Sequence, residues 1–209
     1  MNNRERMLKG FVYDPTAGDI MGDQQACNEI MYDYNATRPS EKQKRHEILK
    51  KLLGSMGKNT YIEPPLHANW GKNTHVGDDF YANFNLTLVD DADIYIGDNV
   101  MIGPNVVIAT AGHPILPSLR KKGMQFNIPV FIGNNVWIGA GALVMPGVKI
   151  GDNSVIGAGS VVTRDIPENC VAYGNPCKPR RAIGEHDRQY YFRDRKIDFE
   201  IDDRKIFGR

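Results

Sequence analysis

Residues 132–162 read IGNNVWIGAGALVMPGVKIGDNSVIGAGSVV. An aliphatic residue opens each group of six, and glycine follows it in most groups. The aliphatic positions in this phase are Ile132, Ile138, Val144, Ile150, Ile156 and Val162. The same step occurs upstream at Ile96, Ile102 and Ile108. A period of six matches neither the 3.6 of an α-helix nor the continued alternation of a long strand. The repeat therefore predicts short strands with a turn in every group.

Three such repeats can close one triangular coil, and stacked coils then satisfy one another's backbone hydrogen bonds. Glycines and the pairs Asp98-Asn99, Asn134-Asn135 and Asp152-Asn153 supply the left-handed backbone that tight corners require. The pattern predicts a mainly β fold, the hexapeptide parallel β-helix. Its left-handed sense is taken from known examples of this fold, because the usual crossover rule would favour the opposite hand.

Two features depart from the period. An earlier set of residues also recurs every six positions: Trp70, Val76, Ala82 and Leu88. This set is offset by two residues from the later series that begins at Ile96, which predicts a two-residue insertion near 90–95. Residues 112–129 (GHPILPSLRKKGMQFNIP) break the repeat altogether. They predict a loop that protrudes from the coil and is basic in its middle, at Arg120, Lys121 and Lys122. Loops of this length in compact domains are often functional.

The flanking segments differ from the repeats. Residues 1–57 predict a small helical cap, with one helix from about Asp23 to Tyr34. Ser40 followed by Gln43 predicts a capping box that opens a second helix. The apolar stripe expected on that helix is Ile48, Leu49, Leu52, Leu53 and Met56, with Gly54 or Gly57 ending it. We thus expect a cap at 1–57, the β-helix at 58–183 and a tail at 184–209.

Composition excludes several classes of protein. Lys and Arg number 26 against 25 Asp and Glu, so the formal charge of +1 argues against binding nucleic acid through bulk charge. The three cysteines are too few for a disulfide scaffold and match no metal spacing. The uncharged run 123–148 contains prolines and glycines that a membrane helix would not tolerate. With no signal peptide visible, we expect a cytoplasmic protein that binds neither nucleic acid nor membranes.

Several motifs together resemble one family. They are YDYNATRPSE (32–41), YANFNLTLVDDADIYIGDNVMIGPNV (81–106), GHP (112–114), the repeats through DIP (132–167), GNPCK (174–178) and YYFRD (190–194). This set is similar to the hexapeptide-repeat sugar O-acetyltransferases of the maltose and galactoside type, and its tail is similar to the galactoside branch. The resemblance implies transfer of an acetyl group from acetyl-CoA to a sugar hydroxyl. It also implies a homotrimer with active sites between subunits.

Such a transfer needs a base, a donor to the tetrahedral oxyanion, and a site for both substrates. Histidine suits the first role because its unperturbed pKa lies near neutrality. Of the five histidines, His113 lies at the start of the loop that interrupts the repeat. The resemblance implies that it is the catalytic base. It would take the hydroxyl proton and later return it to the leaving thiolate, with no acyl-enzyme. His46, His67 and His75 are interpreted as structural or peripheral.

The resemblance also implies binding residues. For the acceptor sugar they are Asp14, Asn69, Tyr81, Asn83 and Asp91. For the cofactor they are Trp137, Ala140, Ala158, Thr163, Arg164, Lys178 and Arg181, where small residues admit the pantetheine arm and cations suit the phosphates. Gln125, or the backbone N–H near it, would stabilise the transition state. Related galactoside enzymes tend to have Ser where Asn69 stands, which leaves the acceptor open.

Three alternatives remain at this point. A γ-type carbonic anhydrase uses the same helix with zinc, but it needs converging histidines, and after His113 the next histidine is His186. We therefore expect no metal. The acceptor could instead be maltose, glucose or another small molecule, although the cap favours a sugar. A non-catalytic scaffold is disfavoured by the combination of His113, the loop and the cations.

Overall fold

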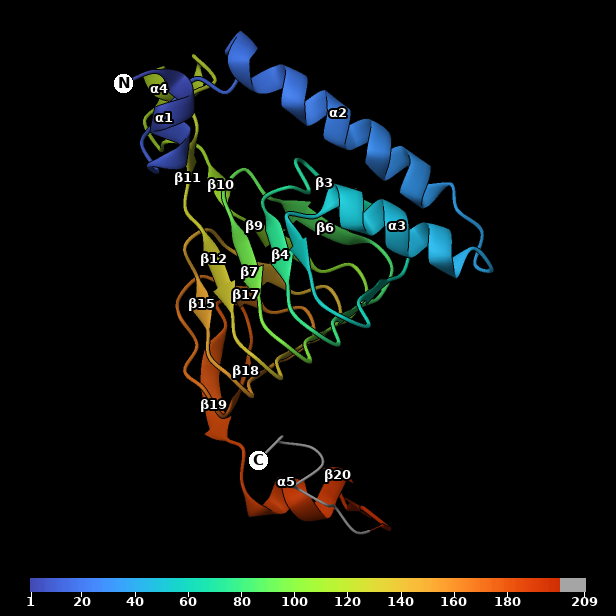
Figure 1. The fold of residues 1–209 in the computed structure, drawn as a ribbon. Coiled ribbons are helices and arrows are strands. Elements are labelled where there is room, and N and C mark those ends of the chain that lie inside the picture. Colours follow the sequence, from blue (N-terminus) through green and yellow to red (C-terminus); the bar gives the residue numbers. More distant parts are fainter. Residues whose placement is uncertain (200–209) are drawn as a thin grey trace.

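The coil predicted from the six-residue period is the core of the molecule. The computed structural model describes residues 1–199, and for residues 19 and 21–23 the backbone alone. Short parallel strands form three faces of a triangular prism (Figure 1). The first face comprises β1 (Ser55–Met56), β4 (Thr74–Val76), β7 (Ile94–Ile96), β12 (Val130–Ile132) and β15 (Lys149–Ile150). The β-helix prediction is confirmed.

The other two faces follow the same order along the chain. The second face comprises β2 (Tyr61–Ile62), β5 (Tyr81–Ala82), β8 (Met101–Ile102), β13 (Trp137–Ile138), β16 (Val155–Ile156) and β18 (Cys170–Tyr173), with β19 (Lys178–Ala182) antiparallel at its end. The third face comprises β3 (Leu66–Ala68), β6 (Leu86–Val89), β9 (Val107–Ala109), β14 (Leu143–Val144) and β17 (Val161–Val162). All aliphatic positions of the period from Ile96 to Val162 are buried, and they form one continuous core.

Left-handed residues turn the chain at the corners, as the sequence predicts. Asn99, Asn135 and Asn153 have φ values of 56°, 56° and 59°. Their side chains also stack along the prism: Asn135 Nδ2 donates to Asn153 Oδ1 at 2.9 Å, and Asn153 Nδ2 donates to Asn169 Oδ1 at 2.8 Å. Asparagine fits here because it tolerates this backbone and bonds to its neighbour in the next coil.

The strand pairing locates the insertions. A regular coil has 18 residues, since Val144 pairs with Val162 and Ile132 with Ile150. The coil from Leu88 to its partner Ile108 has 20 residues. The two extra residues lie between Leu88 and Ile96, so the insertion near 90–95 is confirmed. A second one lies between Ala68 and Val76, because Ala68 pairs with Leu88.

The expected place of Trp70 in the six-step set is therefore wrong. The inward residue of that repeat is Ala68, while Trp70 lies in the enlarged corner. It packs there in a separate apolar cluster with Met7, Tyr13 and Ile20.

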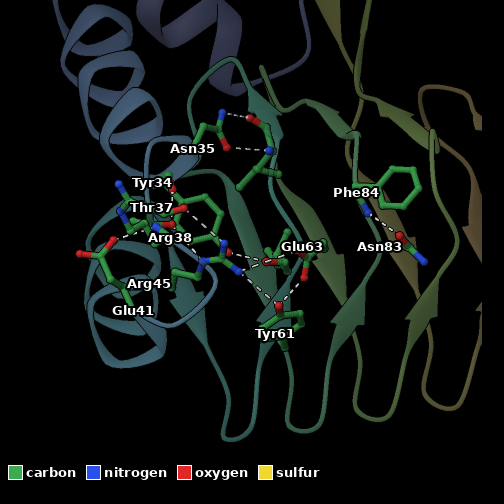
Figure 2. A network of polar contacts seen from close by, with 12 residues as sticks. Tyr34, Asn35, Thr37, Arg38, Glu41, Arg45, Tyr61, Glu63, Asn83 and Phe84 are labelled. Carbon is green, nitrogen blue, oxygen red and sulfur yellow. Dashed lines mark hydrogen bonds and ion pairs between the residues drawn. The ribbon is translucent and has the colours of Figure 1, made fainter.

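Two helices cover the end of the coil at which the first strands lie (Figure 1). They are α2 (Gly18–Asn35) and α3 (Lys42–Leu52). Asn35 accepts a hydrogen bond from Leu66 N and donates to Leu66 O, both at 2.8 Å, so its side chain completes the exposed edge of β3. Arg45 is buried between the helices and the coil, where it donates to Thr37 and Tyr61 (Figure 2). The helical cap is thus tied to the first coil by specific polar contacts.

Helix details differ from expectation. The first predicted helix begins at Gly18 rather than Asp23. The capping box is wrong: the N-cap of α3 is Glu41, which makes no side-chain cap, and Gln43 instead donates to Glu47 at 3.0 Å. Leu49, Leu52 and Leu53 are buried as predicted, whereas Met56, assigned to the same stripe, lies on β1.

The helix α3 also ends without a glycine cap, because its C-cap residue Leu53 is extended. Gly54 serves a different purpose. A Cβ atom there would lie 2.2 Å from the Lys72 carbonyl oxygen, so only glycine permits this close approach of two chain segments.

The remaining elements lie outside the prism. They are α1 (Asn3–Leu8), β10 (Ala111–Gly112), α4 (Pro117–Arg120), β11 (Phe126–Asn127), α5 (Glu185–Gln189), β20 (Tyr190–Phe192) and β21 (Arg195–Lys196). The loop predicted at 112–129 is a hairpin of β10 and β11 that carries α4 at its tip, and α1 packs beside it (Figure 1). Part of the tail predicted at 184–209 lies outside the described residues. In residues 1–199 no helix is long and apolar enough to cross a membrane.

Replacing Asn153 tests the role of the corners. Asn153→Ala removes two hydrogen bonds and forces a Cβ-bearing residue without a polar side chain into the left-handed region, so we expect a loss of about 1–3 kcal/mol in the free energy of unfolding. Asn153→Gly keeps the backbone preference and should lose less. Urea denaturation of both variants measures this. An equal or larger loss for the glycine variant would contradict the argument.

Candidate functional site

The irregular corners of the coil fall on one edge of the prism. We call it the third/first edge, because the chain passes there from the third face to the first. The two enlarged corners, 69–73 and 90–93, lie on it one coil apart. In the next coil the same corner is replaced by the protruding hairpin with His113. The extra residues and the loop are thus stacked along a single edge.

The side chain of Asp91 is the centre of a polar network at this edge. Its Oδ2 accepts a hydrogen bond from Asn69 Nδ2 at 2.8 Å. Its Oδ1 accepts from Gln125 Nε2 at 3.1 Å and from the indole of Trp70 at 3.4 Å. The structure therefore brings together Asn69, Asp91 and Gln125, three of the residues predicted for the site. Asp91 also lines a cavity of about 330 Å³, together with Asn127 and residues of α1.

Gln125 is held in this position by Tyr13, a residue outside the predicted set. Its backbone forms a β-bridge with Tyr13, in which each N–H donates to the other's carbonyl at 2.9–3.0 Å. The Tyr13 hydroxyl accepts from Gln125 Nε2 at 2.8 Å and from Asn127 Nδ2 at 3.0 Å. Burial raises the pKa of Tyr13. Because the Gln125 N–H is committed to Tyr13, a role of Gln125 as oxyanion donor stays a prediction.

Asp14 follows Tyr13 and lies at the margin of the network. Its Oδ1 accepts from the backbone N–H and the hydroxyl of Thr16, at 2.9 and 2.7 Å. These two hydrogen bonds lower the pKa of the Asp14 carboxyl. In this arrangement its side chain forms a local turn.

His113 is exposed on the loop and oriented by one hydrogen bond. Its Nδ1 lies 2.8 Å from the Met124 carbonyl oxygen. A carbonyl can only accept, so Nδ1 carries the hydrogen, and Nε2 of the neutral ring keeps its lone pair. Such a ring is prepared to accept a proton from a hydroxyl group.

Tyr81 and Asn83 lie elsewhere: Tyr81 is on the second face, in β5, and Asn83 follows β5 at the edge where the chain passes from the second face to the third. We call this the second/third edge. Tyr81 is exposed and stacks on Tyr61 at 6.2 Å between centroids. Asn83 Oδ1 accepts from the next residue's N–H, at Phe84, at 2.8 Å (Figure 2). The structure of one chain therefore does not bring these two residues to His113 or Asp91.

The residues predicted to bind the cofactor are also distributed over different edges and faces of the prism. Ala140 and Ala158 are exposed at the second/third edge, one coil apart, and Trp137 is 54% exposed on the second face. Thr163 and Arg164 are exposed at the third/first edge, after β17.

Lys178 and Arg181 belong to β19, at the far end of the second face from the cap. The guanidinium of Arg181 already forms a bidentate pair with Asp187, with both distances 2.7 Å. This pair holds the pKa of Asp187 at about 2.

Comparisons with known proteins agree with the motifs. The profile "Bacterial transferase hexapeptide (six repeats)" matches residues 129–164, and "Maltose acetyltransferase hexapeptide capping motif" matches residues 6–57. The galactoside O-acetyltransferase of Escherichia coli K12 is 51% identical over 94% of this chain and 97% of its own length.

The chain belongs to the hexapeptide-repeat acetyltransferases of the maltose and galactoside type. Two solved structures agree. A galactoside acetyltransferase in complex with coenzyme A is 46% identical, with a TM-score of 0.93 over 95% of this chain and 100% of that one. A maltose O-acetyltransferase from Clostridium difficile 630 is also 46% identical, with a TM-score of 0.87 over 88% and 99%. This acetyltransferase is thus an acyltransferase by family, and the left-handed sense of its coil is that of the family.

Four residues in or beside this polar network were missed from the sequence: Tyr13, Trp70, Asp90 and Asn127. Asn127 was the most accessible to prediction, because it is a polar residue two positions after Gln125 and therefore on the same side of a strand. Tyr13 gave no signal, since its partners lie more than 110 residues away. Among the described side chains, those of residues 1–18, 20 and 24–199, no group of three His, Cys, Asp or Glu could hold a metal ion.

Asp90 gives a pH-dependent test of the site's energetics. The side chain is fully buried, and burial raises its pKa to about 7. The native state therefore binds the proton more tightly than the unfolded chain, and this stabilisation is lost as the pH rises from about 4 to about 7. Relative to wild type, Asp90→Asn should gain ~2–4 kcal/mol in unfolding free energy between pH 4 and pH 8. Urea denaturation at both pH values measures the difference, and a difference that does not change with pH would contradict it.

Proposed function

We propose that this acetyltransferase moves an acetyl group from acetyl-CoA to a hydroxyl of a galactoside or related sugar, with His113 as the general base. The observation that supports this role best is the hydrogen bond from His113 Nδ1 to the Met124 carbonyl. It leaves Nε2 as the proton acceptor on an exposed loop at the edge that also carries Asp91. The identity to galactoside enzymes over nearly the whole chain supports the acceptor class.

The transfer is direct. His113 Nε2 takes the proton of the acceptor hydroxyl while its oxygen attacks the thioester carbonyl carbon. The new C–O bond forms, the C–S bond breaks, and the protonated imidazole returns its proton to the sulfur of coenzyme A. The cysteines take no part as nucleophiles, since Cys27, Cys170 and Cys177 are all buried. Free thiols also fit the reducing cytoplasm, which is the location that we propose.

Asp91 binds the acceptor. A carboxylate offers about four acceptor directions, and Asn69, Trp70 and Gln125 use three of them. The remaining direction is available to a sugar hydroxyl. Asp14 of the same chain, and Tyr81 and Asn83 of a second copy, would complete the acceptor site.

Coenzyme A lies along the column of small, exposed residues Ala140 and Ala158. Trp137 offers an exposed ring beside that column. Thr163, Arg164 and Lys178 add polar and cationic groups, and Arg181 can bind a phosphate if the phosphate displaces Asp187.

The active unit is a homotrimer with sites between subunits. Asn83, Ala140 and Ala158 share one edge of the prism, with Tyr81 beside it on the second face, whereas Asp91 and His113 share another edge. A second copy that places its second/third edge against the third/first edge of the first would join the two halves. Closed ring symmetry then repeats the same site at every interface.

A maltose-type acceptor is the second candidate, because the maltose O-acetyltransferase has the same fold and a similar degree of identity. A panel of galactosides, maltose and glucose, assayed with acetyl-CoA and a thiol-detecting dye, decides between them. The proposed function fails if no sugar stimulates thiol release.

His113→Ala tests the base. We expect turnover to fall by roughly 10²–10⁴ while coenzyme A still binds, because only the proton transfer is lost. Turnover is measured by thiol release and coenzyme A binding by calorimetry. The matched control is His67→Ala, which removes an exposed histidine on β3 and should leave both quantities unchanged. Full turnover in His113→Ala would place the base elsewhere.

Mixed oligomers test the shared site. His113→Ala and Asn83→Ala each disable every interface of a homotrimer, but on different edges. Random mixing by co-refolding gives the correct pair, an intact His113 facing an intact Asn83, at about one interface in four. We expect a mixture of the two variants to regain up to about a quarter of wild-type turnover. A mixture as inactive as its components would show that one chain supplies both residues.

A further inference from the structure

Asp90 is a fully buried carboxylate at the third/first edge, directly before Asp91. Its Oδ1 accepts from the backbone N–H of Trp70 at 2.8 Å, and its Oδ2 accepts from the Thr74 hydroxyl at 3.1 Å. Its backbone carbonyl accepts from Asn73 Nδ2 at 2.8 Å. All three donors lie in or next to the enlarged corner 69–73. Asp90 is therefore the group around which that corner folds.

The same corner supplies two of the three donors to Asp91. Trp70 bonds to both carboxylates, through its backbone N–H to Asp90 and through its indole N–H to Asp91 at 3.4 Å. Asn69, one residue earlier, donates to Asp91 at 2.8 Å. Any movement of the Trp70 backbone would therefore shift both donors and change the direction in which the Asp91 carboxylate points.

The corner has no regular strand partner that would hold it otherwise. It contains two residues more than a regular corner. Its ladder hydrogen bonds stop at Asn69, whose N–H donates to the Leu88 carbonyl at 3.1 Å, and resume at Asn73, whose carbonyl accepts from the Ile94 N–H at 2.8 Å. Within the corner, the Lys72 N–H donates to Trp70 O and the Thr74 N–H to Gly71 O. Between Asn69 and Asn73 these local turns set its shape, and the Asp90 side chain attaches Trp70 to the neighbouring coil.

We propose that Asp90 is a positioning residue for the acceptor: it fixes the corner 69–73 and so directs the Asp91 carboxylate toward the sugar hydroxyl. Asp90 has no contact with the acceptor itself, because it is fully buried. This inference rests on the proposed function. It adds a residue that the family resemblance did not point to.

The test separates positioning from general stability. Asp90→Ala removes both side-chain hydrogen bonds to the corner, so kcat/KM for the sugar should fall roughly 10- to 100-fold, while the KM for acetyl-CoA changes by less than about twofold. Asp90→Asn preserves both contacts, since its amide oxygen accepts from Trp70 and its NH₂ donates to the Thr74 hydroxyl. At pH 7 it should recover most of the lost kcat/KM.

A matched control is Asp98→Asn. The Asp98 carboxylate likewise accepts a backbone N–H from the neighbouring coil, that of Asp78 at 2.7 Å, but at the edge between the first and second faces. It should leave both KM values unchanged. Thermal unfolding of every variant measures the fraction that is folded. Calorimetry with the sugar that the panel identifies measures the affinity for the acceptor independently of turnover.

The outcomes separate the two proposals. If wild type transfers acetyl to no sugar, the proposed function fails. If wild type is active and folded Asp90→Ala keeps its kcat/KM for the sugar, or loses affinity for acetyl-CoA to the same degree, the positioning role of Asp90 is overturned. Equal loss in Asp90→Asn and Asp90→Ala would also overturn it, because the hydrogen bonds to the corner would then not be the cause.

Discussion

The structure depends on backbone hydrogen bonds between successive coils. Gly97 donates to the Ile132 carbonyl and Gly133 to the Ile150 carbonyl, both at 2.9 Å, and the same contact recurs along every face. This ladder fixes the register of the buried aliphatic positions, because a slip by one residue would turn them outward. Additional residues can therefore enter only at corners. In this acetyltransferase both enlarged corners and the loop enter at one edge, and Asp91 and His113 lie there.

The regular part of the fold could be predicted because its signals are local. Ile132 through Val162 repeat every six residues, and Asn99, Asn135 and Asn153 mark the corners with a residue type that tolerates positive φ. The second insertion was missed because Trp70 is apolar and happens to continue the period. Only the pairing of Ala68 with Leu88 shows that it belongs to a corner. The helix α1 was missed because its six residues give too short a pattern.

The site was less predictable than the fold, since its contacts connect distant segments. The resemblance selected Asn69, Asp91 and Gln125, and the structure places them in one network. It did not select Tyr13, whose hydroxyl joins Gln125 to Asn127 across more than 110 residues. Asp90 was hidden for another reason. In the sequence Asp90 stands next to Asp91 and resembles an ordinary surface carboxylate. Only the structure shows that its side chain is completely buried.

The separation of the predicted residues on two edges is itself an argument for assembly. Asn83 and Asp91 could meet within one chain only if the prism bent or its third face opened. The residues between them include Leu86 and Leu88, which are 0% and 1% exposed and pack into the continuous core. Opening that face would break the ladder from β6 to β9 and expose the core, at a cost of several kcal/mol. A second copy requires no such change. The rigidity that makes the coil stable thus also keeps the predicted residues of one chain apart, and this separation favours the proposed assembly.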